Sequence, residues 1–491
     1  MRASQVTEPA KVAPEGGRVI SQKVAVCVVY VAGLFLSTLD MTIVNVALPT
    51  IGRAFDVPAT AVDTVSISYL VSLAVSVTAS GWLGDRFGGR RTLLAAVAVF
   101  TVGSALCGMA TSLVQLDLFR VLQGTGGGML ASVGMAMLLR TFAPHERVRA
   151  SGILSIANGL APTLGPVLGG VLVSQVSWRA IFFVNVPVGI FAVVFGVLFL
   201  HDQPARPAES FDVAGFLLAA SGFGLVMYGV SEGPQQGWAA MPVVIALASG
   251  AALIAALVAV ESRVRAPMID IRLLGNRLFS SGTTVMTLES VTFLGTLFTL
   301  TLYLQDERGM TPVQAGLTTF PEALGVVTGS QLASRLLYRK LRPRRHLIIG
   351  AGGTSLVVAA MALLLSPNTS LWLMIPVLYG MGLAVGQVFV GTQSASFATV
   401  SSTSAGRAST LFNVGRRLGG AAGVATATSV LVAAESPHTV GASAYRAAFL
   451  TLAAVNLLAL CAATRISDHE AASTIPPPRK NTNTLEEELQ P

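Results

Sequence analysis

The stretch GWLGDRFGGRR, residues 81–91, separates two long apolar runs and has a counterpart far along the chain in SQLASRLLYRK, residues 330–340. One leucine and three basic positions stay in step between the two stretches, whereas Asp85 becomes Ser334. A degenerate repeat of this kind is what two duplicated helical bundles leave in a sequence. The pair therefore predicts a chain built from two related halves.

The composition indicates that these halves lie in lipid. Of the 491 residues, 53% are hydrophobic and 11% are charged, and the mean hydropathy is +0.69, whereas soluble domains carry about 25% charged residues. The net charge of +8 is compatible with a nucleic-acid partner. However, the basic residues are spread over short loops between apolar runs, which is the pattern of membrane orientation. We therefore expect the partner to be a lipid bilayer and not a nucleic acid.

Hydropathy windows of about 19 residues predict roughly fourteen membrane-spanning helices. They fall near residues 24–48, 61–83, 92–111, 114–138, 151–173, 181–200, 213–231, 241–260, 279–303, 313–334, 347–366, 371–391, 408–432 and 445–463. Lys and Arg gather in the loops of one side, most densely between residues 335 and 345. The positive-inside rule then places both termini in the cytoplasm.

The predicted fold class is an all-α integral membrane protein with two six-helix bundles and an inserted helix pair. The expected parts are a disordered N-terminal tail over 1–22, a bundle over 23–200, the inserted pair over 201–276, a second bundle over 277–465 and a disordered C-terminal tail over 466–491. The cysteines Cys27, Cys107 and Cys461 each lie in an apolar run, so we expect neither a disulfide nor a metal site.

Few ionisable side chains lie at depth in the predicted spans; they are Asp40, Asp117, Arg120, Glu289 and Glu322. An ionisable group costs at least ~2.5–3.5 kcal/mol there, so each is a functional candidate. We predict that Asp40, Arg120, Glu289 and Glu322 take part in proton coupling. The alternatives are a structural Asp40 permanently paired with an arginine, a local pair between Asp117 and Arg120, and glutamates that pair with each other or lie at helix ends.

Polar residues close to Asp40 predict a substrate site. Asp40, Thr42 and Asn45 form a polar patch in an otherwise apolar helix. With Gln123 and Glu289 they are the candidates for contact with a small molecule.

Several motifs resemble those of the major facilitator superfamily. GWLGDRFGGRR is similar to its loop signature G-x-L-x-D-R-x-G-R-[KR], and it departs at Gly89, where a basic residue is usual. LDLFRVLQGTGGG, residues 116–128, resembles the fourth-helix motif. GPVLGG, residues 165–170, resembles the fifth-helix motif of antiporters, with Ala161 where an upstream glycine is usual.

Three further stretches resemble the fourteen-span drug:proton antiporter branch, namely LDMTIVNVALP (39–49), SWRAIFFVNVPVG (177–189) and RRLGGAAGVA (416–425). The resemblance implies a monomeric transporter of the cell membrane that exports small hydrophobic or cationic molecules in exchange for protons. It implies no cofactor besides the proton gradient and no enzymatic activity. The alternatives are a proton-coupled uptake symporter and, more remotely, a membrane enzyme or receptor.

Two of these motifs also have a physical interpretation. A carboxylate in a tight loop can cap backbone N–H groups and pair with a basic residue, so we predict a conformational latch made of Gly81, Asp85, Arg86, Gly88 and Arg90. Small residues let helices approach closely, and a proline bends its helix. We therefore predict a mechanical role for Gly165, Pro166, Gly169 and Gly170. The alternatives are a solvated loop charge and generic small-residue packing.

Overall fold

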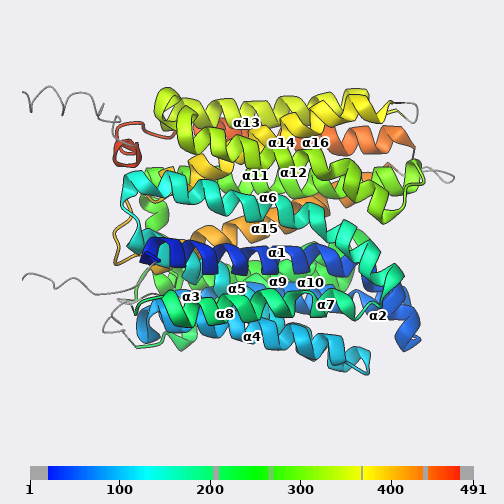
Figure 1. Cartoon of the computed structure of the whole chain (residues 1–491), viewed down its shortest axis with the longest axis horizontal. Coiled ribbons are helices and arrows are strands. Elements are labelled where there is room, and N and C mark those ends of the chain that lie inside the picture. The colour runs from blue at the N-terminus through cyan, green and yellow to red at the C-terminus, as the bar shows by residue number, and fades with distance from the viewer. Residues whose placement is uncertain are drawn as a thin grey trace, which may run out of the picture.

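The computed structural model describes residues 20–202, 210–264, 267, 269–366, 369–434 and 441–475. Long helices lie side by side along one axis, and no strand occurs among these residues (Figure 1). The first described helix begins at the same end of the molecule at which the last described segment lies. We call this end the arginine-rich end, because Arg86, Arg140 and Arg339 lie near the helix ends there, and the other the opposite end.

The described residues of the N-terminal half contain eight helical elements. They are α1 (Gln22–Phe55), α2 (Ala59–Val62), α3 (Thr64–Phe87), α4 (Gly89–Met109), α5 (Leu113–Thr141), α6 (Pro144–Gln175), α7 (Ala180–Phe183) and α8 (Asn185–Phe199).

The remainder contains eight α-helices and four short segments. They are α9 (Val213–Gln236), α10 (Met241–Glu261), η1 (Ile271–Gly275), α11 (Arg277–Leu302), η2 (Tyr303–Glu307), α12 (Pro312–Leu332), η3 (Ala333–Leu337), α13 (Tyr338–Leu364), α14 (Leu371–Ser396), α15 (Ala405–Ala433), α16 (Ala442–Ala463) and η4 (Ala472–Thr474).

Local sequence signals account for several helix boundaries. The Ser112 hydroxyl accepts a hydrogen bond from the backbone of Gln115 at the start of α5. Thr311 and Gln314 form a capping box at the start of α12, which satisfies two backbone donors reciprocally. Gly88 joins α3 to α4 at φ 86°, a conformation that glycine adopts without steric cost. The loop signature thus contains the glycine that its turn requires.

Twelve helical stretches in the described residues are long and apolar enough to cross a membrane. One of them is Pro312–Leu364, which joins two predicted spans, because α12 continues through η3 into α13. The chain turns inside this stretch at Arg342, whose φ is 63°, directly before Pro343; a residue before proline is disfavoured in the helical region. The span predicted at 408–432 coincides with α15, which is outside the twelve because Arg416 and Arg417 lower its hydropathy.

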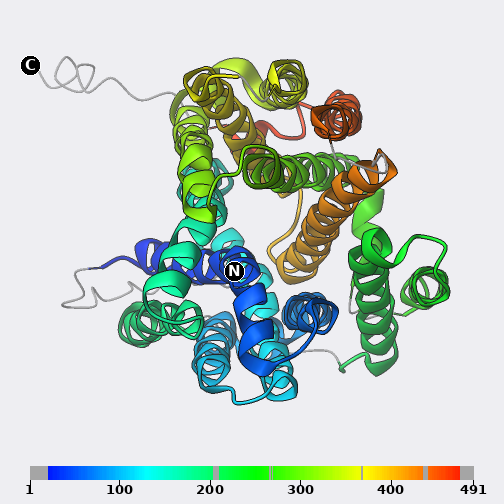
Figure 2. The ribbon, with the colours of Figure 1, turned by 90° about the vertical axis from the view of Figure 1, so that its right-hand side faces the viewer.

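The helices pack as two groups with a pair at their side. In the first group, α1, α3, α4, α5, α6 and α8 contact one another, and in the second, α11 to α16 do so. The groups meet where α6 packs on α12 and where α3 packs on α15. The pair α9 and α10 packs against the first group through α3 and against the second through α15 (Figure 2). Of the predicted coupling residues, Asp40 and Arg120 therefore lie on helices of the first group, and Glu289 and Glu322 lie on helices of the second.

Part of the predicted disordered C-terminal tail is packed. Ile466, Ala471 and Thr474 are buried. The Thr474 hydroxyl lies 2.8 Å from the Tyr338 hydroxyl, and Asp468 accepts a hydrogen bond from the Arg344 backbone. The prediction was therefore wrong for residues 466–475, because short apolar and hydroxyl residues dock on α13. Residues 476–491 and 1–19 lie outside the described residues.

Candidate functional site

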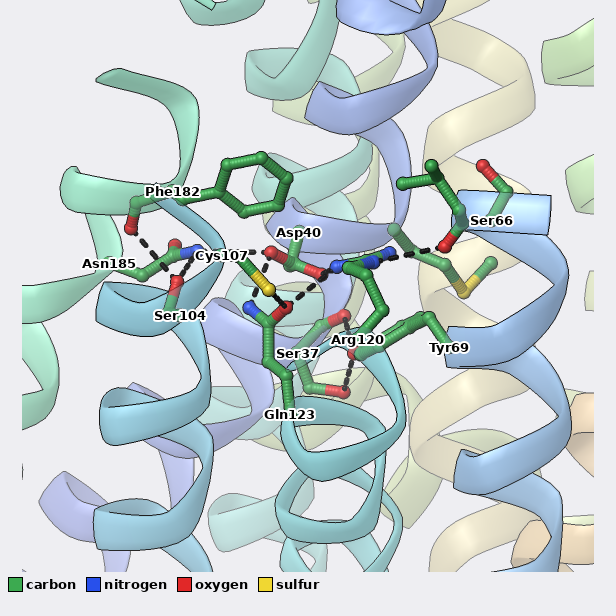
Figure 3. A network of polar contacts seen from close by, with 12 residues as sticks. Ser37, Asp40, Ser66, Tyr69, Ser104, Cys107, Arg120, Gln123, Phe182 and Asn185 are labelled. Carbon is green, nitrogen blue, oxygen red and sulfur yellow. Dashed lines mark hydrogen bonds and ion pairs between the residues drawn. The ribbon is translucent and has the colours of Figure 1, made fainter. Parts of the chain in front are cut away.

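Asp40 lies at the centre of a buried polar network in the first helix group (Figure 3). Its Oδ2 forms an ion pair with the guanidinium of Arg120 on α5. Its Oδ1 accepts hydrogen bonds from Gln123 Nε2 at 2.8 Å and from Asn185 Nδ2 at 3.1 Å. Three side chains thus donate to one carboxylate that is fully buried.

Arg120 is buried and fully engaged. Its Nη1 also donates to Gln123 at 2.8 Å and its Nε donates to the Val65 carbonyl at 3.1 Å. The guanidinium lies 4.1 Å from the centre of the Tyr69 ring, a cation–π distance. The local pairing with Asp117 was wrong. Asp117 is only partly buried and accepts from Thr64 instead, because one helical turn on α5 brings it to the helix end.

The sequence interpretation missed several members of this network. Asn185 donates to both Asp40 and the Ser104 hydroxyl, and Cys107 lies 3.6 Å from the Gln123 oxygen. Tyr69 donates to the Ser37 carbonyl and lies 3.2 Å from its hydroxyl. A signal existed for Asn185, which is an amide inside the apolar stretch SWRAIFFVNVPVG; none existed for Tyr69.

The predicted patch of Asp40, Thr42 and Asn45 is divided among three surroundings. Asp40 points into the network, and Thr42 packs against α6, where a carbon added at Gly165 would lie 2.0 Å from its hydroxyl. Asn45 is exposed and accepts a hydrogen bond from Ser66 at 3.2 Å. Successive helix positions are rotated by about 100°, which explains why neighbours in sequence do not share a site.

Glu289 and Glu322 are both buried but do not pair with each other. Glu289 on α11 accepts from Thr354 on α13 at 2.8 Å, so it lies inside the second helix group. Glu322 on α12 lies 3.4 Å from the hydroxyl of Thr163 on α6, so it lies between the two groups. Among the described residues, no cationic side chain forms an ion pair with either glutamate. Each also keeps one carboxyl oxygen without a hydrogen-bond partner.

The loop signature lies where the two groups touch at the arginine-rich end. Asp85 forms an ion pair with Arg140 on α5, and a carbon added at Gly406, in the first turn of α15, would lie 3.4 Å from Asp85 Oδ2. A carbon at Gly81 would lie 3.2 Å from the Gly406 backbone. The carboxylate therefore faces the start of a helix from the other group, where the helix dipole favours a negative charge.

The other residues of the signature have separate positions. Arg90 donates to the Val197 carbonyl at 2.8 Å and lies 3.3 Å from Asp202, Gly88 makes the turn, and Arg86 is exposed.

The fifth-helix motif lies at a junction of three helices. A carbon added at Gly169 would lie 3.0 Å from the Ile43 carbonyl on α1, and one at Gly170 would lie 2.7 Å from Val313 on α12. Pro166 lies beside Gly316, also on α12, because a carbon there would lie 3.5 Å from its Cβ. Together with Gly165 against Thr42, these residues make α6 an element that touches both groups.

Hydrogen bonds join the two groups at the arginine-rich end. Gln331 donates to the Gly152 carbonyl at 3.0 Å, and Arg147 donates to the Phe397 carbonyl at 3.0 Å. The hydroxyls of Ser80 and Thr410 lie 3.3 Å apart. This end is therefore closed between the groups.

Two packed helix groups around buried intramembrane charges are the architecture of a multi-pass membrane transporter. The sequence profile of the Major Facilitator Superfamily matches residues 30–424, and the chain belongs to this family.

The relatives support the same assignment. The chain is 35% identical over 398 residues to the tetracenomycin C resistance and export protein of Streptomyces glaucescens, covering 80% of this chain and 73% of that protein. It is 34% identical over 408 residues to a multidrug resistance protein B homolog of Mycobacterium tuberculosis, covering 82% of this chain and 75% of that protein. The chain is therefore related to multidrug and antibiotic efflux proteins, as its motifs predict.

Solved structures share the fold at low sequence identity. The human organic anion transporter MFSD10 superposes with a TM-score of 0.64 at 17% identity, covering 90% of this chain and 100% of that chain. The proton:xylose symporter XylE superposes with a TM-score of 0.63 at 14% identity, covering 90% of this chain and 94% of that chain. The predicted major facilitator fold is confirmed.

Proposed function

We propose that the protein is an antiporter that exports small amphipathic drugs or antibiotics across the cytoplasmic membrane in exchange for protons. The observation that carries this proposal is the pair of buried carboxylates Asp40 and Glu322 in a transporter related to resistance and export proteins. Carboxylates inside a membrane protein commonly mark proton paths.

Within this scheme, Asp40 and Glu322 have different tasks. Both carboxylate oxygens of Asp40 are engaged by Arg120, Gln123 and Asn185 in this state, so a proton reaches them only when that network loosens. Glu322 has one hydroxyl donor and no cation beside it, and an unpaired buried charge is costly. We infer that Glu322 carries the proton in this state and that Asp40 receives one in another state of the cycle.

The position of Glu322 favours it over Glu289 as the coupling residue. Glu322 contacts Thr163, two residues before Gly165 on α6, a helix that touches both groups. A change of its charge therefore acts directly on the interface that must open. Glu289 is enclosed among helices of the second group and has a structural role in this scheme.

The arrangement of the chain follows from the same proposal. We propose fourteen spans, with bundles over 23–200 and 277–465, an inserted pair over 201–276, and a monomeric protein with the arginine-rich end in the cytoplasm, where the positive-inside rule puts it. Since that end is closed by contacts between the groups, this state would open outward. Asn45, Thr42 and Gln123 remain the candidates for substrate contact.

Transport in liposomes tests the proposal. Purified protein is reconstituted with an imposed pH gradient, and the movement of cationic and hydrophobic dyes is followed together with proton flux. We expect dye to move against the proton flux, and to stop when an ionophore abolishes the gradient. Dye that moves together with protons would support the symporter alternative, and dye movement unaffected by the ionophore would exclude proton coupling.

A further inference from the structure

We propose that Arg417 on α15, with the charge of Arg416 beside it, binds an acidic group, a carboxylate, on the transported molecule. This inference rests on the proposed function, since it concerns which molecules are carried. It also extends the expected substrates, which were hydrophobic or cationic molecules, to amphipathic acids.

Arg417 lies between the two helix groups. Figure 2 shows α15 (orange) crossing the middle of the molecule between the N-terminal helices and the remainder. From α15 its Nη2 donates to the Ser37 hydroxyl on α1 at 3.3 Å, and its Nη1 lies 3.5 Å from the Met41 sulfur. The guanidinium therefore belongs to the interface that must open and close around a substrate.

The charge of this arginine pair is uncompensated. No ion pair among the described residues includes Arg416 or Arg417. A hydroxyl and a thioether are weak acceptors for a guanidinium, and Arg417 Nε is buried with no hydrogen-bond partner. Arg416 has only a 3.4 Å contact with the amide of Asn413. Two cations at membrane depth without an anion are costly, so an anionic ligand is attracted to them.

The surroundings offer polar and apolar partners for such a ligand. Both arginines are partly exposed, and Asn45 is exposed. Ser37, Met41 and Asn45 are spaced by four residues and so share one face of α1. This face offers a hydroxyl, a flexible apolar side chain and an amide, whereas Asp40 is turned away into its own network. An acid group at Arg417 with an apolar body beside Met41 matches this chemistry.

The site is also connected to the Asp40 network. Ser37, which receives the hydrogen bond from Arg417, lies 3.2 Å from the Tyr69 hydroxyl, and the Tyr69 ring lies 4.1 Å from the Arg120 guanidinium. A ligand that draws Arg417 away from Ser37 therefore changes the surroundings of Tyr69. This contact gives the binding of an acid a physical route to the carboxylate proposed to take up a proton.

A pair of dyes that differ only in the acid group tests the assignment. Rhodamine B carries a free carboxylate, and its ethyl ester does not. Binding of each dye to the full-length protein in nanodiscs of phosphatidylcholine is measured by fluorescence anisotropy without any gradient. We expect the wild type to prefer the acid, and Arg417→Gln to weaken binding of the acid about tenfold, as the loss of a charge-assisted contact does, while ester binding stays unchanged.

Further variants separate this site from a general effect of charge. Arg416→Gln should weaken acid binding less than Arg417→Gln, and Arg417→Lys should retain part of it. The control Arg149→Gln removes an exposed charge on α6 and should change neither dye. Equal binding of the two dyes by the wild type, or a wild-type preference retained in Arg417→Gln, would overturn the proposal.

Two additional readouts identify the source of the anion. Phosphatidylglycerol that displaces rhodamine B from the wild type but is not carried would assign the site to a lipid headgroup and overturn the assignment to a transported molecule. Proton-driven export of the ester is measured separately. If the ester is not exported while the wild type still binds the acid dye more tightly, the proposed function would be contradicted and the binding site would stand.

Discussion

At the scale of single residues, the Asp40–Arg120 pair is the feature with the largest consequence. Both side chains are almost completely buried, and removing one partner of a buried ion pair typically costs about 3–5 kcal/mol because the other charge is left unpaired. A loss of export after substitution of Asp40 alone therefore has two explanations, namely a lost proton site and a destabilised protein.

A double variant separates these explanations. We expect Asp40→Asn to reduce gradient-driven export about tenfold or more and to lower the thermal stability, because Arg120 loses its anion. Asp40→Asn with Arg120→Gln should recover stability, since no unpaired charge remains, but not export. Thermal unfolding in detergent and export from liposomes are measured on both. Export restored in the double variant would show that Asp40 only neutralises Arg120.

Glu322 provides the second prediction at this scale. Glu322→Gln keeps the size of the side chain and an oxygen for Thr163 but cannot exchange a proton, so we expect gradient-driven export to fall about tenfold, with normal stability. Glu289→Gln is the matched control and should export nearly as well as the wild type. Proton flux and export are measured in the same liposomes. The reverse pattern would transfer the coupling role to Glu289.

At the scale of helices, the sequence predicts position better than pairing. The length of apolar runs depends on membrane thickness, so the predicted spans lie within a few residues of most helices. The stretch after α12 was predicted as a loop because of its arginines, yet η3 continues the helix there. The sequence left a pairing of Asp40 with an arginine open as an alternative but could not assign it to Arg120, because residues on different helices share no periodicity. Asp117 was the local candidate for pairing with Arg120, but it lies near the start of α5 instead.

Helix α6 approaches α1 closely at Gly165, so a large side chain should not be tolerated there. Gly165→Leu should reduce export about tenfold or more without removing the protein from the membrane, because small residues are what allow two helices to touch. A single carbon at Gly165 already meets the Thr42 hydroxyl at 2.0 Å. The control is Gly380→Leu on α14, where the nearest atom to an added carbon is 3.9 Å away. Equal export by both variants would leave the motif without a mechanical role.

At the scale of the whole molecule, the sequence repeat corresponds to two similar contacts between the groups. In one, Gly81 and Asp85 lie against Gly406; in the other, Ser334 lies against α6, where a carbon at Gly152 would meet its hydroxyl at 2.6 Å. The replacement of Asp85 by Ser334 therefore leaves the second contact without the acid. The two closures of the arginine-rich end are related in position but not in charge.

This asymmetry predicts that the acidic contact controls turnover. Asp85→Asn removes a partly buried ion pair with Arg140, and we expect export to slow about tenfold, as for the loss of about 1.4 kcal/mol, with substrate affinity unchanged. The control is Asp202→Asn, because Asp202 is exposed in its pair with Arg90 and an ion pair at the surface is worth about 0–1 kcal/mol. Initial export rates and equilibrium dye binding are compared. Normal rates with weakened binding would assign Asp85 to the substrate site.

A covalent lock tests whether opening at the arginine-rich end is required for export. The hydroxyls of Ser80 and Thr410 lie 3.3 Å apart across the two groups, close enough for cysteines at these positions to form a disulfide in this state. The exposed Cys461 is first replaced by alanine, because the other two native cysteines are buried. We expect oxidation of Ser80→Cys with Thr410→Cys to abolish export, and a reductant to restore it, because the groups can no longer separate at this end.

The single-cysteine variants should be insensitive to oxidant. Dye binding from the opposite end should survive in the locked protein if this state opens outward. Export at the wild-type rate by fully cross-linked protein would show that the two groups do not separate at this end during transport.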